Sequence, residues 1–199
     1  MIVIDLEFSG LNFLESGIWQ IGAIELENPK NVFFDECRID DGDSIEKEAL
    51  EVVGKTESYL RDKGKQSQKQ LLEKFFKWCG KAKLKNFACQ GPQWDVALLI
   101  LKANKYGLKF PMHRRAFDLH SIASMKYIEL NKKLLAEEGH SAMGIGNICR
   151  LCGMKDERGT HNALEDAKLA AECLSRIIYG KQLLDEYKKF KIPEYLKKQ

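Results

Sequence analysis

The chain has 199 residues, a hydrophobic content of 44% and a formal net charge of +3. This length suits one domain with a sizeable core, and the composition is ordinary for a globular protein. The small charge excludes a strongly basic nucleic-acid-binding protein, and no run of about twenty apolar residues predicts a membrane span. Because no secretory signal is recognisable either, we expect a cytoplasmic protein with no membrane partner.

The chain opens with an apolar run that ends in two carboxylates, Asp5 and Glu7. We expect a strand over residues 1–7 that is buried on both faces. Side chains two residues apart in a strand share a face, so both carboxylates would lie together at its carboxyl end. A divalent cation such as Mg²⁺ would remove their repulsion and desolvation. An ordinary exposed strand end is the alternative, because this short pattern also occurs by chance.

The first half of the chain is expected to continue as an antiparallel meander and then to turn helical. Its periodicity predicts strands over residues 17–26 and 31–38, helices over 45–53 and 67–79, and a strand over 85–89. Lysine and arginine are frequent between residues 55 and 85. These side chains could follow a phosphate backbone, although a solvated helix face explains most of them equally well.

A buried helix is predicted over residues 94–106, because the segment after Asp95 is almost continuously apolar. Asp95 lies in its first turn, where a carboxylate interacts favourably with the helix dipole. Taken alone, this acid therefore needs no functional explanation. A strand over residues 115–117 is expected next, and Asp118 is expected to cap the helix after it.

The last long helix, expected over residues 162–178, begins with a histidine and a carboxylate that should meet. Asn162 and Glu165 have the spacing of a capping box with Asn162 as the N-cap. His161 and Asp166 then occupy the two positions that contact each other in a hydrophobic staple. Placed there, an imidazole and a carboxylate can serve a metal ion and its bound water. A surface helix start with an incidental histidine is the alternative.

Further helices are expected over residues 143–152 and 180–190. The first contains Cys149 and Cys152, which have the spacing of half a zinc site or of a redox pair. No second cysteine pair or close histidine pair in the sequence completes such a site, so we interpret them as thiols on a helix face that packs on the core. The tail after residue 190 is either a docking arm or frayed.

Together these motifs resemble those of the DnaQ-like 3′→5′ exonucleases of the DEDDh type, in the ribonuclease H-like superfamily. The segment Asp5-Leu6-Glu7-Phe8-Ser9-Gly10-Leu11 is similar to the first family motif, Asp95 stands at the second, and His161 with Asp166 at the third. The resemblance extends over about residues 1–178. Each motif is weak alone, but their order and spacing are specific. One departure is Cys89-Gln90-Gly91-Pro92-Gln93, where many members have a His-Asn pair.

The resemblance implies an α/β fold of the ribonuclease H-like class. Its central mixed five-stranded sheet would have the first three strands antiparallel and would be flanked by helices. The exonuclease domain would cover residues 1–180. Residues 181–199 would form a C-terminal helix and a basic tail that belong to the same domain.

The resemblance also implies a two-metal reaction at the 3′ end of single-stranded DNA or RNA, with nucleoside 5′-monophosphates as products. Asp5, Glu7, Asp95 and Asp166 would hold two Mg²⁺ or Mn²⁺ ions, and His161 would accept the proton of the attacking water. Leu11 would insert between the last two bases. The substrate-binding residues that the resemblance suggests are Phe8, Ser9, Gly10, Leu11, Lys55 and Thr56.

Two other functions are compatible with the sequence. A ribonuclease H-like endonuclease would share the fold, but the spacing of His161 and Asp166 favours the exonuclease. A catalytically silent module that binds nucleic acid or a polymerase is disfavoured, because unused clustered carboxylates only lower stability. The sequence does not distinguish DNA from RNA or short oligonucleotides, or a monomer from a homodimer or a polymerase-bound subunit.

Overall fold

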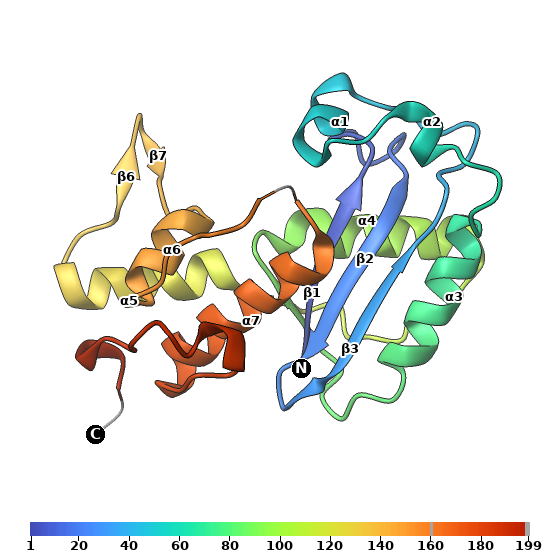
Figure 1. Cartoon of the computed structure of the whole chain (residues 1–199). Coiled ribbons are helices and arrows are strands. Elements are labelled where there is room, and N and C mark those ends of the chain that lie inside the picture. The colour runs from blue at the N-terminus through green and yellow to red at the C-terminus, as the bar shows by residue number, and fades with distance from the viewer. Residues whose placement is uncertain (160, 198–199) are drawn as a thin grey trace.

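The computed structural model describes residues 1–159 and 161–197, and a five-stranded mixed sheet forms its centre (Figure 1). The strand order is β3-β2-β1-β4-β5. β1 (Ile2–Phe8), β2 (Ile18–Glu25) and β3 (Asn28–Glu36) are antiparallel neighbours, and β4 (Phe87–Cys89) and β5 (Phe117–Asp118) run parallel to β1. The predicted ribonuclease H-like sheet, with its first three strands antiparallel, is confirmed.

Helices cover both faces of the sheet, and β1 is buried between them. Ile2, Ile4 and Leu6 pack into a core with α3 (Gln68–Cys79) and α4 (Pro92–Lys105). Val3 packs into a second core on the other face, which α5 (Leu119–Asn131), α6 (Ile145–Leu151) and α7 (Ala163–Tyr179) complete. Because strand side chains alternate, Asp5 and Glu7 lie on the α7 face, next to Val3.

Two smaller units stand at the edge of this arrangement. α1 (Lys47–Val53) and α2 (Glu57–Leu60) form a small core around the buried Trp19, near the carboxyl end of β1 (Figure 1). β6 (Ala136–Glu137) and β7 (His140–Ser141) form a projecting hairpin. The sequence analysis did not predict α2 or the hairpin, because both are too short to show a periodicity.

Most of the predicted elements are present, with boundaries fixed by local chemistry. Asp118 caps α5 as predicted, since its carboxylate accepts the N–H groups of His120 and Ser121. α4 begins two residues before its predicted start because Pro92, which needs no N–H partner there, occupies its first turn.

The helix predicted over residues 180–190 is wrong. Gly180 ends α7 in the left-handed conformation, with a φ of 64°. After it the described chain has only one 3₁₀ turn before residue 190, η1 (Asp185–Tyr187). Two buried side chains of α7 bind the backbone of this segment in place of helical partners. Glu172 accepts the N–H groups of Leu183 and Leu184, and Arg176 donates to the carbonyls of Tyr187 and Phe190.

The end of the described chain packs against the domain. A second 3₁₀ turn, η2 (Glu194–Leu196), buries Leu196, and the Tyr195 hydroxyl donates to the carbonyl of Leu151 at 2.9 Å. Cys149 and Cys152 are buried free thiols beneath it, in agreement with the packing interpretation. Within residues 1–159 and 161–197, no helix has the length and apolar character needed to cross a membrane.

Candidate active site

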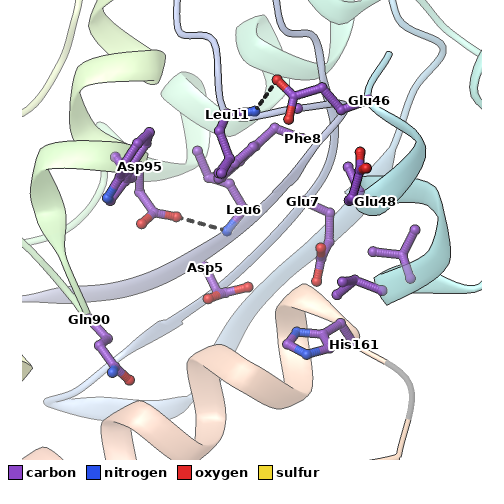
Figure 2. A pocket seen from close by; sticks show the side chains of 15 residues that line it. Asp5, Leu6, Glu7, Phe8, Leu11, Glu46, Glu48, Gln90, Asp95 and His161 are labelled. Atoms are coloured by element: carbon purple, nitrogen blue, oxygen red, sulfur yellow. Dashed lines mark hydrogen bonds between the residues drawn. The ribbon is translucent and has the colours of Figure 1, made fainter. Parts of the chain in front are cut away.

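The carboxylates of Asp5 and Glu7 point from β1 towards the start of α7, where His161 lies (Figure 2). Asp5 pairs with Gly22 and Glu7 with Gln20 in the β1–β2 register. The two acids therefore stand side by side on one face of the sheet, as the alternation of strand side chains predicts.

The start of α7 is held on β2 by two residues that the sequence analysis did not single out. The N–H of Ala163 donates to Oε1 of Gln20 at 2.8 Å. Gly22 lies directly beneath, because a Cβ added there would be 2.1 Å from the carbonyl carbon of Ala163. A glycine inside a strand often marks such a close approach, and this was the available signal. This close packing of α7 on β2 brings His161 and Asp166 next to Glu7.

His161 and Asp166 are neighbours, as the staple positions predict. Nδ1 of His161 lies 3.4 Å from Oδ2 of Asp166. Asn162 caps the helix, accepting the N–H groups of Leu164 and Glu165, but only this half of the predicted capping box forms. The Glu165 carboxylate instead accepts from Lys168. Glu7, His161 and Asp166 each offer a ligand atom within 4.8 Å of the other two.

Asp95 approaches the same place from the opposite face of the sheet. It is buried in the first turn of α4, and its Oδ1 accepts the N–H of Leu6 at 3.0 Å (Figure 2). This hydrogen bond ties the start of α4 to β1, between Asp5 and Glu7. Asp95 therefore has a structural partner and also lines the pocket in which the two β1 carboxylates lie.

The carboxylates of Asp5, Glu7 and Asp95 are difficult to ionise without a cation. Burial, followed by the charges of Asp166 and Asp95, raises the pKa of Glu7 to about 8. Burial raises the pKa of Asp95 to about 7, and burial with the neighbouring acids raises the pKa of Asp5 well above its usual range. Oε1 of Glu7 is buried and has no hydrogen-bond partner among the described residues. This oxygen-rich set of ligands fits Mg²⁺ or Mn²⁺. Such a cation would offset the repulsion between the carboxylates and would give Oε1 of Glu7 a partner.

A pocket of about 400 Å³ opens over these acids. Apolar side chains of the loop after β1 and of α1 form its walls, and the exposed Leu11 extends over it. The N–H of Leu11 donates to Oε1 of Glu46 at 2.9 Å, which holds the loop in place (Figure 2). The described residues that line the pocket are Asp5, Leu6, Glu7, Phe8, Gly10, Leu11, Glu46, Glu48, Ala49, Val52, Val53, Gln90, Trp94, Asp95 and His161.

Of the six residues suggested for substrate binding, the structure places Phe8, Gly10 and Leu11 in the pocket lining. Three lie outside it. Ser9 is buried beneath the loop, where its hydroxyl bonds the backbone of Ser44 and Gly17. Thr56 caps α2, and Lys55 lies over the ring of Tyr59.

Comparisons with known proteins agree with this geometry. The family model for the RNase T exonucleases matches residues 2–174. The nuclease domain of 3′hExo, a DEDDh family member bound to rAMP, superposes with a TM-score of 0.67 at 15% identity, covering 97% of this chain and 95% of that one. The cell-death related nuclease 4 (CRN-4) gives a TM-score of 0.69 at 16% identity, covering 89% and 62%.

E. coli exonuclease I in its zinc-bound complex with single-stranded DNA gives a TM-score of 0.67 at 13% identity. The match covers 87% of this chain but only 40% of that larger protein. The search of curated protein sequences gave no match. The family match covers most of the chain, and the acids and histidine of all three family motifs gather at one place. The chain therefore belongs to the RNase T family of exonucleases, and its fold is similar to that of the nuclease domain of 3′hExo, a DEDDh family member.

Proposed function

We propose that this chain removes nucleotides one at a time from the 3′ end of single-stranded DNA or RNA and releases nucleoside 5′-monophosphates. The observation that carries the proposal is the convergence of Asp5, Glu7, Asp95 and Asp166 with His161 at one end of the sheet. Three of the acids are buried, and one buried carboxylate oxygen, Oε1 of Glu7, lacks a partner. A silent module would gain nothing from this arrangement, since such a cluster lowers stability.

The four acids would hold two divalent cations, Mg²⁺ or Mn²⁺. When bound, such ions lower the pKa of a coordinated water and stabilise the charge on the leaving 3′-oxygen. Glu7 and Asp166 would contribute ligands from β1 and α7, and Asp5 from the same face of β1. Asp95 would contribute from α4 while its other oxygen keeps the N–H of Leu6. The carboxylates thus supply the negative charge that the cations need.

His161 would accept the proton of the attacking water. Its side chain is 47% exposed at the mouth of the pocket, so it can exchange that proton with solvent. The nearby Oδ2 of Asp166 can hold the ring in one orientation and stabilise it when it is protonated. An imidazole is suited to this transfer near neutral pH.

The pocket would receive the 3′-terminal nucleotide. Phe8 and Leu11 offer apolar surface to the base, and the fixed loop after β1 presents Leu11 for insertion between the last two bases. The similar structures include complexes of exonuclease I with single-stranded DNA and a nuclease domain bound to rAMP. We propose DNA and RNA alike as substrates, because base stacking on apolar side chains does not depend on the sugar.

A time course on 5′-labelled single-stranded DNA and RNA of one sequence tests the proposal, with Mn²⁺, Mg²⁺ or EDTA. Wild type should give a ladder that shortens from the 3′ end, and EDTA or Asp166→Ala should abolish it. Asp185→Asn is the matched control, because this exposed acid lies at the other end of α7 and should cleave like wild type. Intact substrate with both metals would refute the exonuclease and favour the catalytically silent binding module.

The cytoplasmic location, a homodimer and a polymerase partner stay proposals. For a homodimer, the relevant surface is β3, an edge strand of the sheet that exposes Val32 and Phe34. Exposed edge strands with apolar side chains favour pairing with another chain. Light scattering on the purified protein measures whether a dimer forms, and a dimer that Phe34→Lys dissociates would use this edge.

A further inference from the structure

The segment between α6 and α7 brings a guanidinium group against a proposed metal ligand. Nη1 of Arg158 donates to Oδ1 of Asp166 at 2.9 Å. The Arg158 side chain is 22% exposed and that of Asp166 only 6%, so this ion pair is largely shielded from water. A pair in such a position is better fixed than an ion pair at the open surface.

Arg158 is itself held by a second carboxylate. Its Nε donates to Oδ1 of Asp156 at 2.8 Å, and its Nη2 donates to Oδ2 of Asp156 at 2.7 Å. This two-point contact occupies one edge of the planar group and directs Nη1 towards Asp166. The charges of Asp156 and Arg158 nearly cancel. Arg158 therefore donates a hydrogen bond to Asp166 while the pair adds little net positive charge to the site.

The two oxygens of Asp166 then have different environments. Oδ1 accepts from Arg158, and Oδ2 lies 3.4 Å from Nδ1 of His161. We propose that Arg158, oriented by Asp156, is a positioning residue that fixes the Asp166 carboxylate so that Oδ2 faces the metal site. This inference rests on the proposed function. Hydrogen bonds to ligating carboxylates of this kind commonly set metal affinity.

Arg158→Lys is the sharpest test, because it conserves the charge but replaces the planar fork with one ammonium group. A lysine cannot contact Asp156 at two points and also direct a donor to Asp166. We expect the affinity for Mn²⁺, measured by calorimetry without nucleic acid, to fall by about 10- to 100-fold. The turnover number should fall too, whereas KM for an oligonucleotide should not change, since Arg158 acts through Asp166.

Three further variants separate positioning from charge and from folding. Asp156→Asn should lower the Mn²⁺ affinity by less than Arg158→Lys does, because the asparagine oxygen can still accept one hydrogen bond from the guanidinium of Arg158. Arg158→Ala should lose metal affinity as well, with thermal unfolding in EDTA showing that it folds. Arg150→Ala is the control, because this exposed arginine of α6 contacts Asn147 and is not in the pocket lining.

Wild-type affinity for Mn²⁺ in Arg158→Lys would overturn the inference, since charge alone would then suffice. Tighter binding in Arg158→Ala would also overturn it, by showing that the guanidinium competes with the cation. A raised KM at unchanged Mn²⁺ affinity would mean that Arg158 binds the substrate phosphate directly, and this too contradicts positioning. Failure of the proposed function has another signature, which is wild-type protein that binds no Mn²⁺ and cleaves neither oligonucleotide.

Discussion

His161 differs from Glu7, Asp95 and Asp166 in that nearly half of its side chain is exposed, while those three acids are buried. It is nevertheless close enough to Glu7 and Asp166 to share a cation with them. Proton acceptor and metal ligand are therefore two distinct roles that its position allows, and they make opposite predictions for metal binding.

We expect His161→Ala to lower the turnover number by about 10²- to 10⁴-fold, the contribution typical of a general base. Mn²⁺ affinity should be largely retained, because four carboxylates remain. Single-turnover cleavage and calorimetry on the same preparation measure both quantities. Asp166→Ala, which should lose both, provides the comparison. If His161→Ala loses Mn²⁺ as strongly as Asp166→Ala does, the imidazole is a ligand and its assignment as the base is wrong.

The acids of the site make a second prediction, on the pH dependence of stability. The folded pKa values of Glu7 and Asp95, about 8 and about 7, lie above those of unfolded carboxyl groups. Between about pH 5 and pH 8 the native state therefore binds more protons than the unfolded state, so these groups make metal-free stability fall as pH rises. Metal binding displaces those protons, so the stabilisation by Mn²⁺ should grow over the same range.

Thermal unfolding at pH 6 and pH 8, with EDTA and with Mn²⁺, measures this effect. The metal-free protein should melt lower at pH 8 than at pH 6, and the increase on adding Mn²⁺ should be larger at pH 8. Glu7→Gln serves as the control, because it cannot ionise and should flatten the pH dependence. A metal-free protein that becomes more stable towards pH 8 would contradict the raised pKa values.

At the scale of elements, the site depends on how closely α7 approaches β2. Gly22 lies under the first turn of α7, and no space for a side chain exists between the strand and the helix. Gly22→Val should displace the start of α7, separate Asp166 from Glu7, and lower the free energy of unfolding by about 1–3 kcal/mol, as overpacking does. Urea denaturation and Mn²⁺ calorimetry measure the two losses.

Gly42→Val is the matched control for this substitution, because a Cβ at Gly42 would meet no atom within 4 Å. It should keep both stability and metal affinity. Equal behaviour of the two valine variants would mean that the approach of α7 to β2 does not determine the site.

The elements also show which parts of the structure were predictable. β1, α4, α7 and the capping residue Asn162 follow from local patterns of apolar and capping residues, and their motif residues converge as expected. Gln20 and Arg158 were not foreseen. Gln20 contacts Ala163, 143 residues away, and nothing in its neighbours along the chain indicates that partner. In the sequence, Arg158 cannot be distinguished from an ordinary surface cation. Only the folded structure shows that its side chain contacts Asp166.

The failed helix over residues 180–190 has a similar cause. Its sequence is compatible with a helix, but Glu172 and Arg176 offer its backbone stronger partners within the core. Tertiary contacts of this kind override local propensity. The missed hairpin of β6 and β7 is too short for periodicity to be read, so only the turn at Glu138 and Gly139, with positive φ at both, marks it.

For the whole molecule, we propose that residues 181–199 belong to the same folding unit as residues 1–180. The argument rests on the interior of α7, from which two charged side chains reach the C-terminal segment. Leu183, Leu184, Tyr187 and Phe190 also pack against the core on the α7 face of the sheet. Since Asp166 stands at the start of the same helix, the segment that stabilises α7 supports the site as well.

Arg176 is the residue at which this proposal can be tested. Its side chain is fully buried, its Nε donates to the equally buried Glu172 at 2.6 Å, and its other donors bind the carbonyls of Cys152, Tyr187 and Phe190. Arg176→Ala would leave a buried carboxylate and three carbonyls without this partner. We expect it to lower the free energy of unfolding by about 3–5 kcal/mol.

Replacing both charged residues should not restore stability. In many proteins an apolar pair of similar volume can substitute for a buried ion pair. Here Glu172→Met with Arg176→Leu would still leave three carbonyls and the N–H groups of Leu183 and Leu184 unpaired, so the double variant should remain destabilised. Lys197→Ala, which breaks an exposed pair with Glu194, should change stability by less than about 1 kcal/mol. Urea denaturation measures all three variants, and wild-type stability of Arg176→Ala would contradict the proposal that these contacts join the C-terminal segment to α7.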